Sequence, residues 1–485
     1  MTRPARIETD YLVVGSGAVG LAFADTLLTE SDARITIVDR HGKPGGHWND
    51  AYSFVTLHQP SAFYGVNSLP LGSGLKDAHG LNAGLYELAS GPEVCGYFDA
   101  VMRQRLLTSG RVDYFPMTDY RGEGRVVSLL TGEETQVQVR RKTVDATWFG
   151  TTVPSTHTPA FTVAEGVRLV PPNALPNLAQ TGGPVPHRYV ILGAGKTAMD
   201  VAVWLIGAGV PADRVTWVRP RESWLLNRLC TQPGEEFFHD SIGAQARAYE
   251  AFAAAPTADA LFEQLEAAGN MLRIDPSVRP QMFHYATVSA GEVEVLRRIT
   301  DVIRQGRVRA IEKSGLRFDD AFVPVEAGAL YIDCTASAVT RRPAVPVFDG
   351  DRITLQMVRI PAPTFSAALA AWVEVHIGDQ ARRNELCATC DVPDTVADYA
   401  KAELANLRNQ LAWSTEPELR RWIRESRLDG FGKVVRAVTP DQTDRMAVLM
   451  ALRDKAWPAA ANLQRLAGPT AEAAPAFSAS SISPS

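Results

Sequence analysis

Residues 11–39, YLVVGSGAVGLAFADTLLTESDARITIVD, decide how the chain begins to fold. The apolar run at 11–14 predicts a short buried strand, 20–30 predicts a helix, and 35–39 predicts a second strand. A strand, a helix and a second strand in this order form a βαβ unit, so the chain is predicted to open on an α/β domain with a parallel sheet.

The turn between the first strand and the helix is a complete G-x-G-x-x-G of Gly15, Gly17 and Gly20. These glycines let the backbone approach a pyrophosphate at the helix N-terminus and let helix and strand pack closely. Asp39 ends the second strand, 19 residues after Gly20. A carboxylate there can accept hydrogen bonds from ribose hydroxyls, so the turn is predicted to hold a dinucleotide.

The segment 44–48, PGGHW, follows this acid. A Gly-Gly pair permits close approach of the backbone to a bulky ligand, and Trp48 can cover that ligand. Dehydrogenases that use only NAD do not need such an element. The predicted residues of the first site are Gly15, Gly17, Ala18, Gly20, Asp39, Arg40, Gly46, His47 and Trp48.

A second βαβ unit follows a Pro/Gly-rich stretch at 170–187, with strand RYVIL, turn GAGKTAMD and strand VTWV. The GKT resembles the end of an NTPase phosphate loop, but that loop needs a glycine five residues before Gly195. Val190 stands there, inside the expected strand, and excludes an NTPase. Gly193 and Gly195 instead take the first two positions of a dinucleotide turn, with Ala198 in place of the third glycine.

Basic side chains accompany this second turn. Lys196 and Thr197 stand at the helix N-terminus, where they can reach a phosphate. Arg219 and Arg221 follow the next strand, where an NAD enzyme has its ribose acid. Arginine pairs with a 2′-phosphate in a bidentate manner, which favours NADPH over NADH. Two solvated loop arginines are the alternative interpretation.

Composition narrows the class of protein. The chain has 485 residues, of which 46% are apolar and 21% charged, as in a globular protein with two or three domains. A net charge of −5 argues against nucleic acid or an anionic membrane as a partner. The five cysteines form no disulfide framework, and neither a signal peptide nor a membrane span is expected. We therefore expect a cytoplasmic protein; homo-oligomerisation stays open.

Four features together resemble the two-dinucleotide-binding flavoproteins: GSGAVG, the acid at 39, GGHW and the second turn. They are most similar to the flavin-containing monooxygenases, which belong to the class B flavoprotein monooxygenases. The resemblance covers roughly 10–235 and 325–375. It implies FAD at the first turn, NADPH at the second, and a small organic substrate. It also implies that NADPH reduces FAD, that O2 adds at flavin C4a, and that one oxygen atom is inserted, with nitrogen or sulfur as the favoured acceptor.

Two strand ends, VDATW at 144–148 and YIDCTA at 331–336, resemble the ATG segments by which chains of this family pass between domains. Trp148 and Ser337 stand where glycine is usual. On this resemblance Asp333 is assigned to the FAD site.

The family also carries an FxGxxxHxxx(F/Y) linker before its second turn. His157 and Phe161 match the HxxxF part, although the spacing from Gly150 to the histidine is longer. A hinge histidine bonded to backbone is the alternative for His157.

The segment after GGHW lies along the flavin in this family. Leu57 falls near the position where some members have an asparagine, and His58 and Gln59 follow. His58 and Gln59 are the predicted catalytic contacts, with structural loop hydrogen bonds as the alternative. The helix at 365–376 is expected to direct its N-terminus at the flavin, and 282–285 is a substrate-pocket candidate from its location alone.

Cys387 and Cys390 form a C-x-x-C that suggests a disulfide reductase. They lie far past both glycine turns in a polar loop, and no second ligand pair accompanies them as zinc would need. We interpret them as incidental cysteines and expect no metal site.

The predicted fold is α/β, with two Rossmann-like dinucleotide-binding domains, an antiparallel β layer at 111–148 and a helical C-terminal part. A flavoprotein reductase or oxidase is the alternative function, followed by a nucleotide-binding regulatory protein without turnover. The expected divisions are 1–165 with 325–395 for FAD, 166–324 for NADPH with a helical insertion at about 238–305, 396–467 for C-terminal helices, and 468–485 for a disordered tail.

Overall fold

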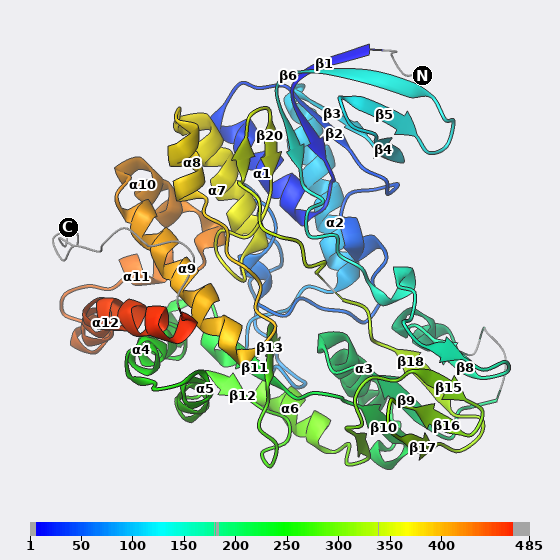
Figure 1. Ribbon diagram of the computed structural model, residues 1–485. Helices are drawn as coiled ribbons and strands as arrows, with labels where there is room; N and C mark the ends of the chain where they lie inside the picture. Colours follow the sequence, from blue (N-terminus) through cyan, green and yellow to red (C-terminus); the bar gives the residue numbers. More distant parts are fainter. Residues whose placement is uncertain (1–5, 179, 181–183, 338, 469–485) are drawn as a thin grey trace.

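The computed structural model of the protein describes residues 6–468 except 179, 181–183 and 338. Figure 1 shows an α/β part that carries the N-terminal strand, a second α/β part at the lower right and a helical part at the lower left. The expected tail lies, beyond Gly468, outside the described residues.

The first sheet is a Rossmann-like sheet in the order β19-β20-β6-β1-β2-β3. Its parallel pairs are β20 with β6, β6 with β1, β1 with β2, and β2 with β3. The helices α1 and α7 pack on each other and share one apolar core with this sheet. The bounds are β1 Arg6–Val14, α1 Ala18–Glu30, β2 Ile35–Val38, β3 Val112–Phe115, β6 Glu134–Asp145, β19 Phe348–Asp349, β20 Arg352–Thr354 and α7 Pro363–His376.

The expected antiparallel layer at 111–148 is smaller than the sequence suggested. Only β4 (Thr118–Tyr120) and β5 (Arg125–Ser128) run antiparallel, and β5 pairs with the start of β6. The strand β6 takes part in both arrangements, because it pairs antiparallel with β5 and parallel with β1. The strand β3 pairs parallel with β2. The prediction was wrong for β3 because alternating polar and apolar residues show that a strand forms but do not show its direction.

The second sheet is also parallel, in the order β14-β10-β9-β18-β8. The central strands β9, β10 and β18 are buried along their whole length. Because β18 pairs with β9, the chain returns to the first sheet after Asp333, later than the expected boundary at 325. The bounds are β8 Arg168–Val170, β9 Tyr189–Leu192, α3 Lys196–Gly207, β10 Val215–Val218, α6 Ala290–Arg297, β14 Val302–Ile303 and β18 Leu330–Asp333.

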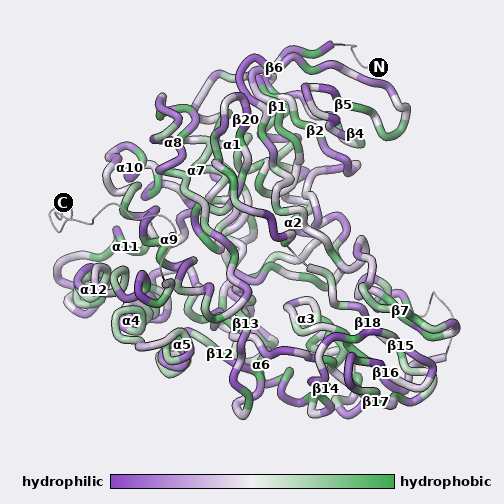
Figure 2. The backbone as a smooth tube through the Cα atoms, in the orientation of Figure 1, coloured by the Kyte–Doolittle hydropathy of each residue, from purple (hydrophilic) through white to green (hydrophobic). Residues whose placement is uncertain are grey.

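A small four-stranded sheet in the order β17-β16-β15-β7 packs against the second sheet through a shared apolar cluster. Figure 2 shows that apolar residues are frequent in the strands of the main sheets, whereas the outer loops are mostly polar. The bounds of the small sheet are β7 Thr162–Val163, β15 Ala310–Glu312, β16 Gly315–Arg317 and β17 Phe322–Pro324.

The helical part is built from the insertion and the C-terminal helices, with α12 packed along α4 and α9 (Figure 1). The insertion at about 238–305, expected to be mostly helical, contains α4, α5 and α6, but it also contains β13, which pairs with β11. Its sequence MFHYATV is rich in aromatic and β-branched residues, which favour strands. The bounds are α2 Gly91–Ala100, β11 Ser223–Asn227, α4 Phe238–Ala254, α5 Ala258–Ala267, β12 Met271–Leu272, β13 Met282–Val288, α8 Gln380–Leu386, α9 Val396–Ser414, α10 Pro417–Glu425, α11 Gly432–Arg436 and α12 Thr443–Ala467.

Candidate dinucleotide-binding sites

The first glycine turn has the close contacts that its sequence predicts. Gly15 adopts φ +106°, and its N–H donates to the Val38 carbonyl at 2.8 Å. A Cβ added to Gly20 would lie 2.0 Å from the Gly15 carbonyl oxygen. A Cβ added to Gly46 would lie 3.0 Å from the Cα of Gly17, so the PGGHW loop rests directly on the turn. The backbone around the start of α1 therefore has the open shape that a pyrophosphate needs.

Asp39 is held by four hydrogen bonds from two residues. Its Oδ2 accepts from the Ser16 N–H at 2.5 Å and from the Ser16 hydroxyl at 2.9 Å. Its Oδ1 accepts from the His41 N–H at 2.7 Å and lies 3.0 Å from His41 Nδ1. Burial alone would raise the pKa of Asp39, but the hydrogen bonds from His41 and Ser16 outweigh burial and lower it. A ribose hydroxyl would share this ionised carboxylate with these donors or replace one of them.

His41 links two acids around the first turn. Its Nε2 lies 2.8 Å from Oδ2 of Asp50, while Nδ1 faces Asp39. The hydrogen bond to Asp39 raises the pKa of His41 to about 9, and Asp50 adds to the shift. His41 is therefore an imidazolium at neutral pH. Sequence reasoning did not identify Ser16, His41 or Asp50; the position of His41 two residues after the ribose acid was the available signal.

Four other predicted residues take different positions around this turn. His47 stacks on Trp48 with ring centroids 5.3 Å apart, and Trp48 Nε1 donates to the Tyr64 hydroxyl at 2.9 Å. Burial lowers the pKa of His47 to about 4, so its ring is neutral. The side chain of Arg40 is 75% exposed and lies 3.6 Å from Asp119, whereas Ala18 is buried as the first residue of α1.

The second glycine turn repeats the backbone geometry of the first. Gly193 adopts φ +122°, and its N–H donates to the Val218 carbonyl at 3.1 Å. A Cβ added to Gly193 would lie 2.6 Å from the Cys334 carbonyl oxygen. Gly195 caps α3 and is exposed, with no heavy atom within 4 Å of an added Cβ. Open space at the start of α3 is what a phosphate requires there.

Lys196 points to a carboxylate within its own helix. Its Nζ forms an ion pair with Asp200, one turn along α3. Asp200 also accepts a 2.7 Å hydrogen bond from the hydroxyl of Tyr52, which comes from the loop after PGGHW. Thr197 acts on the same hydroxyl and lowers the pKa of Tyr52, although burial and Asp200 raise it overall. The second turn is thereby joined to the first unit.

The two predicted arginines after β10 have different environments. Arg219 is buried, lies 2.8 Å from Glu222 and has its guanidinium 4.6 Å from the Trp217 ring centroid. Within the described residues, its Nη1 has no hydrogen-bond partner, so a donor of this buried group is unsatisfied. Arg221 is exposed. The unsatisfied donor and the exposed guanidinium fit a 2′-phosphate at this strand end.

The two ATG-like segments form a structural repeat. Oδ1 of Asp145 accepts from the Thr147 N–H at 2.9 Å and from its hydroxyl at 2.7 Å. Oδ1 of Asp333 accepts from the Thr335 N–H at 2.9 Å and from its hydroxyl at 2.6 Å. Each segment closes over the first glycine of its own turn. The structure thus places Asp333 beside the second turn, at the end of β18.

The two predicted linker residues, His157 and Phe161, contact different parts of the structure. His157 Nε2 lies 3.2 Å from the Thr335 hydroxyl and 3.9 Å from Asp333, so His157 joins the linker to the end of β18. Phe161 packs instead on the apolar cluster of the small sheet. The linkers after β6 and β18 also run together, since Thr340 N–H donates to the Phe149 carbonyl at 2.9 Å.

His58 lies where the loop of the first unit meets the second turn. Burial lowers the pKa of His58 to about 3, and the nearby cations Lys196 and Arg228 lower it further. The ring is therefore neutral. Arg228 is fully buried, donates from Nε to the His58 carbonyl at 3.0 Å and pairs with Glu292 at 2.5 Å. Gln59 is half-buried on the same loop. Sequence reasoning missed Arg228 and Glu292 because this contact joins distant segments.

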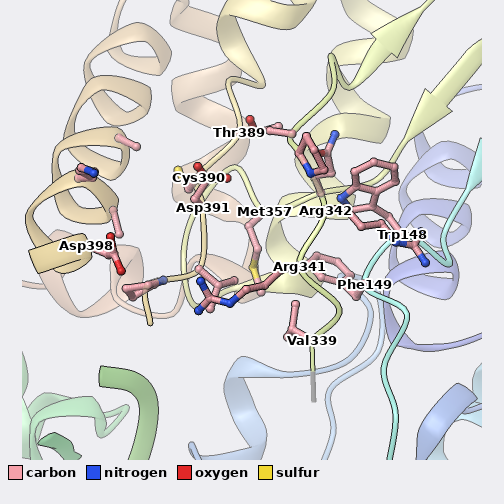
Figure 3. A pocket seen from close by; sticks show the side chains of 18 of the residues that line it. Trp148, Phe149, Val339, Arg341, Arg342, Met357, Thr389, Cys390, Asp391 and Asp398 are labelled. Carbon is pink, nitrogen blue, oxygen red and sulfur yellow. The ribbon is translucent and has the colours of Figure 1, made fainter. Parts of the chain in front are cut away.

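A pocket of about 430 Å³ lies between the two linkers and α9. Trp148, Phe149 and Arg342 line one side of it, with Asp398 on the opposite side (Figure 3). The substrate candidates at 282–285 lie elsewhere, because Phe283 and its neighbours pack inside an aromatic core and only His284 is exposed.

Cys387 and Cys390 are both buried and unpaired. They belong to different apolar clusters. Burial raises the pKa of both thiols, that of Cys390 to about 12. A protonated thiol is a poor nucleophile, which fits the interpretation of incidental cysteines.

Residues 13–68 match the family model of the NAD(P)-binding Rossmann-like domain. Uncharacterised proteins of Mycobacterium tuberculosis and Mycobacterium bovis are each 50% identical to the chain over 430 residues, which cover 88% of this chain and 78% of theirs. The chain belongs to their family.

Two solved structures similar to this chain are monooxygenases. A flavin-containing monooxygenase from Stenotrophomonas maltophilia is 15% identical, with 76% of this chain and 98% of that chain covered and a TM-score of 0.44. A polycyclic ketone monooxygenase from Thermothelomyces thermophila is 15% identical, with 95% and 86% covered and a TM-score of 0.48. At these values the similarity assigns no role to any residue of this chain. Among the described residues, no helix is long and apolar enough to cross a membrane.

Proposed function

We propose that this protein is an FAD- and NADPH-dependent monooxygenase that oxygenates a small organic substrate, with nitrogen or sulfur as the favoured acceptor atom. The observation that carries the proposal is the pair of dinucleotide turns joined by the Tyr52–Asp200 hydrogen bond. The first has a carboxylate, Asp39, at its ribose position, and the second has Arg219 and Arg221 there. Two turns of different chemistry, joined in one chain, suit the transfer of electrons from one dinucleotide to another.

The first site has the residues to hold FAD. The N-terminus of α1, which has no side-chain cap, suits the pyrophosphate, and Asp39, whose pKa is lowered, is an acceptor for the ribose. Gly46 keeps the PGGHW loop close enough for Trp48 to lie along the cofactor. When bound, the flavin supplies hydride acceptance and activation of O2.

The second site has the residues to hold NADPH. Gly195 leaves space for the pyrophosphate, while Arg221 and the unsatisfied donor of Arg219 suit the 2′-phosphate. Lys196 is paired with Asp200, so it acts on the position of α3 rather than directly on a phosphate.

His58 is the side chain of this chain best placed to act between the two sites. Its ring is neutral at physiological pH, so it can donate one hydrogen bond and accept another without carrying charge. Arg228 fixes the backbone of this residue through its carbonyl. We propose that His58 orients a polar group near the flavin, with Gln59 beside it.

A flavoprotein reductase or oxidase is the second candidate, and one observation favours it. Leu57 is buried in the apolar core, so position 57 offers no polar contact to a reacting oxygen. Such a site reduces the flavin but stabilises no oxygenating species.

Rapid-mixing spectroscopy separates these activities. The purified protein should be yellow, and NADPH should bleach its flavin absorbance in the absence of air. Mixing with O2 should then produce a transient band distinct from oxidised and reduced flavin, which trimethylamine or thioanisole should shorten. Immediate return of oxidised flavin would indicate an oxidase, slow reoxidation with a preference for another acceptor would indicate a reductase, and colourless protein would contradict the proposal altogether.

A further inference from the structure

We propose that the pocket between the two linkers and α9 binds a small organic acid with an apolar body, with Arg342 as the anchor for its carboxylate. Only the identification of this acid as the substrate rests on the proposed function; its binding does not. The inference starts from where the pocket lies. Trp148 follows β6 and Met357 follows β20, so two strand ends of the first sheet meet at the pocket, and Arg342 comes from the linker after β18. Ligands of α/β sheets bind outside such carboxyl ends.

About half of the surface that lines the pocket is apolar. Its apolar members include Trp148, Phe149, Met357, Val392 and Ala405. Figure 3 shows these side chains around the cavity. A volume of about 430 Å³ lies within the range of sites for drug-sized molecules. The apolar half of the lining suits a ligand of moderate size with an apolar body.

The charged side chains that line the pocket differ in whether they already have a partner within the protein. Arg341 lies 3.1 Å from Asp394, which also takes a 2.7 Å contact from His284. Asp398 caps α9, where it accepts from the Thr395 N–H at 3.1 Å and from its hydroxyl at 2.9 Å. These groups already have partners within the protein.

Arg342 differs from them. In the described part of the chain no carboxylate lies within 4.0 Å of its guanidinium, which stands 5.4 Å from the centroid of the Trp148 ring. A guanidinium that lies over an aromatic face keeps its N–H donors directed outward in a fork that matches a carboxylate. The pocket thus presents one free bidentate donor beside an apolar wall.

A single negative charge fits this pocket better than a phosphate. Asp391 and Asp398 lie across the cavity from Arg342 (Figure 3). Arg341, Arg342 and Lys401 oppose these two acids in the lining, so its charged side chains leave a net charge of +1, which suits a single negative charge. The 2′-phosphate of NADPH also has its own candidate arginines after β10. A phosphate and a carboxylate are both anions that Arg342 could bind. We favour the carboxylate of an organic acid.

Calorimetric titration of the purified holoenzyme, without NADPH, tests the proposal. The probes are naphthylacetate and its neutral analogue naphthylacetamide, which differ in charge but little in shape. We expect the acid to bind at least tenfold more tightly than the amide. Arg342→Gln should abolish this preference. Arg317→Gln, which removes an exposed arginine on β16, is the matched control and should retain it.

Two outcomes would overturn the proposal. Equal affinity for acid and amide in the unsubstituted protein would show that no anion anchor exists. An Arg342→Gln variant that keeps the preference, or one that instead raises the KM for NADPH but not for NADH, would place the anion site elsewhere or assign Arg342 to the cofactor. Binding is measured without turnover, so the two proposals can fail separately. If the acid bound but the O2-mixing experiment gave no oxygenating species, only the proposed function would be contradicted.

Discussion

The hydroxyl of Tyr52 donates a 2.7 Å hydrogen bond to Oδ2 of Asp200. Tyr52 belongs to the loop that follows the first glycine turn, and Asp200 lies in the first turns of the helix that starts at the second. The contact is therefore a direct link between the two candidate cofactor sites. Both groups are largely shielded from water, and Asp200 also forms an ion pair with Lys196, so the hydrogen bond is charge-assisted.

Removing the Tyr52 hydroxyl should weaken the contact between the two α/β units and so lower the stability of the protein. For Tyr52→Phe we expect a loss of about 1.5–3 kcal/mol in the free energy of unfolding, the usual contribution of a hydrogen bond to a charged group. Denaturant titration measures it, and a double-mutant cycle with Asp200→Asn isolates the pair. Tyr331→Phe, a buried tyrosine in β18, is the matched control. Additive losses in the cycle would show that the two residues do not interact.

The His41 bridge should make stability depend on pH in the alkaline range. The folded state raises the pKa of His41 from 6.5 to about 9, so its contribution is fully present below pH 6.5 and lost as the pH rises through 9. A third of the side chain is exposed, so we expect only about 1–2 kcal/mol after discounting for solvent screening. Thermal unfolding over this range should show a decline that His41→Gln removes. An equal decline in both proteins would refute the bridge.

A buried carboxyl in the helical part should also make stability fall with rising pH, but from a lower pH. Glu403 accepts a 2.8 Å hydrogen bond from the Tyr285 hydroxyl, and burial raises the pKa of Glu403 above its ordinary 4.5. The folded state therefore holds this proton more tightly than the unfolded chain, so stability falls as the pH rises above 4.5. Glu403→Gln keeps an acceptor for Tyr285 and removes the ionisation.

We expect Glu403→Gln to raise the free energy of unfolding by about 1 kcal/mol near neutral pH and to leave it unchanged well below pH 4.5. Glu250→Gln, which removes an exposed carboxylate on α4, should have no such pH-dependent effect. Denaturant titration at several pH values gives the comparison. A gain of equal size at every pH would point to packing rather than to the proton.

Much of the fold followed from the sequence because glycine turns carry local information. Gly15 and Gly193 sit in the left-handed region and meet the neighbouring backbone, so the turn geometry predicted from each motif has a direct physical cause. The helix at 365–376 was confirmed as α7 for a similar reason, since its apolar residues are buried along nearly its whole length. Strand direction in β3 carried no such local signal.

The contacts around the candidate sites depended on distant residues and could not be predicted. His58 is neutral because protein surrounds it and because Arg228, which lies far along the chain, faces it. The same holds for Tyr52 and Asp200, which are 148 positions apart. The sequence identified Arg219 and Arg221 as a pair with one role, but burial separates them. Tertiary packing determines these features, and a single sequence does not encode them in any short pattern.

This separation of the two arginines gives a prediction about cofactor selection. Arg221 is exposed, whereas Arg219 is buried against Glu222 and Trp217. We expect Arg221→Gln to raise the KM for NADPH about tenfold and to change that for NADH little, because the lost contact, of about 1.4 kcal/mol, is made only to the 2′-phosphate. Steady-state kinetics with both nucleotides measures this split.

Arg219→Gln should behave differently, because it leaves Glu222 short of one of its two arginine partners in a buried position. Breaking a buried ion pair costs about 3–5 kcal/mol, so we expect a fall in thermal stability together with weaker binding of both nucleotides. Arg214→Gln, at an exposed arginine just before β10, is the control for both variants. If Arg221→Gln impaired NADPH and NADH equally, the 2′-phosphate would not lie at this strand end, and the assignment of NADPH to the second turn would lose its chemical basis.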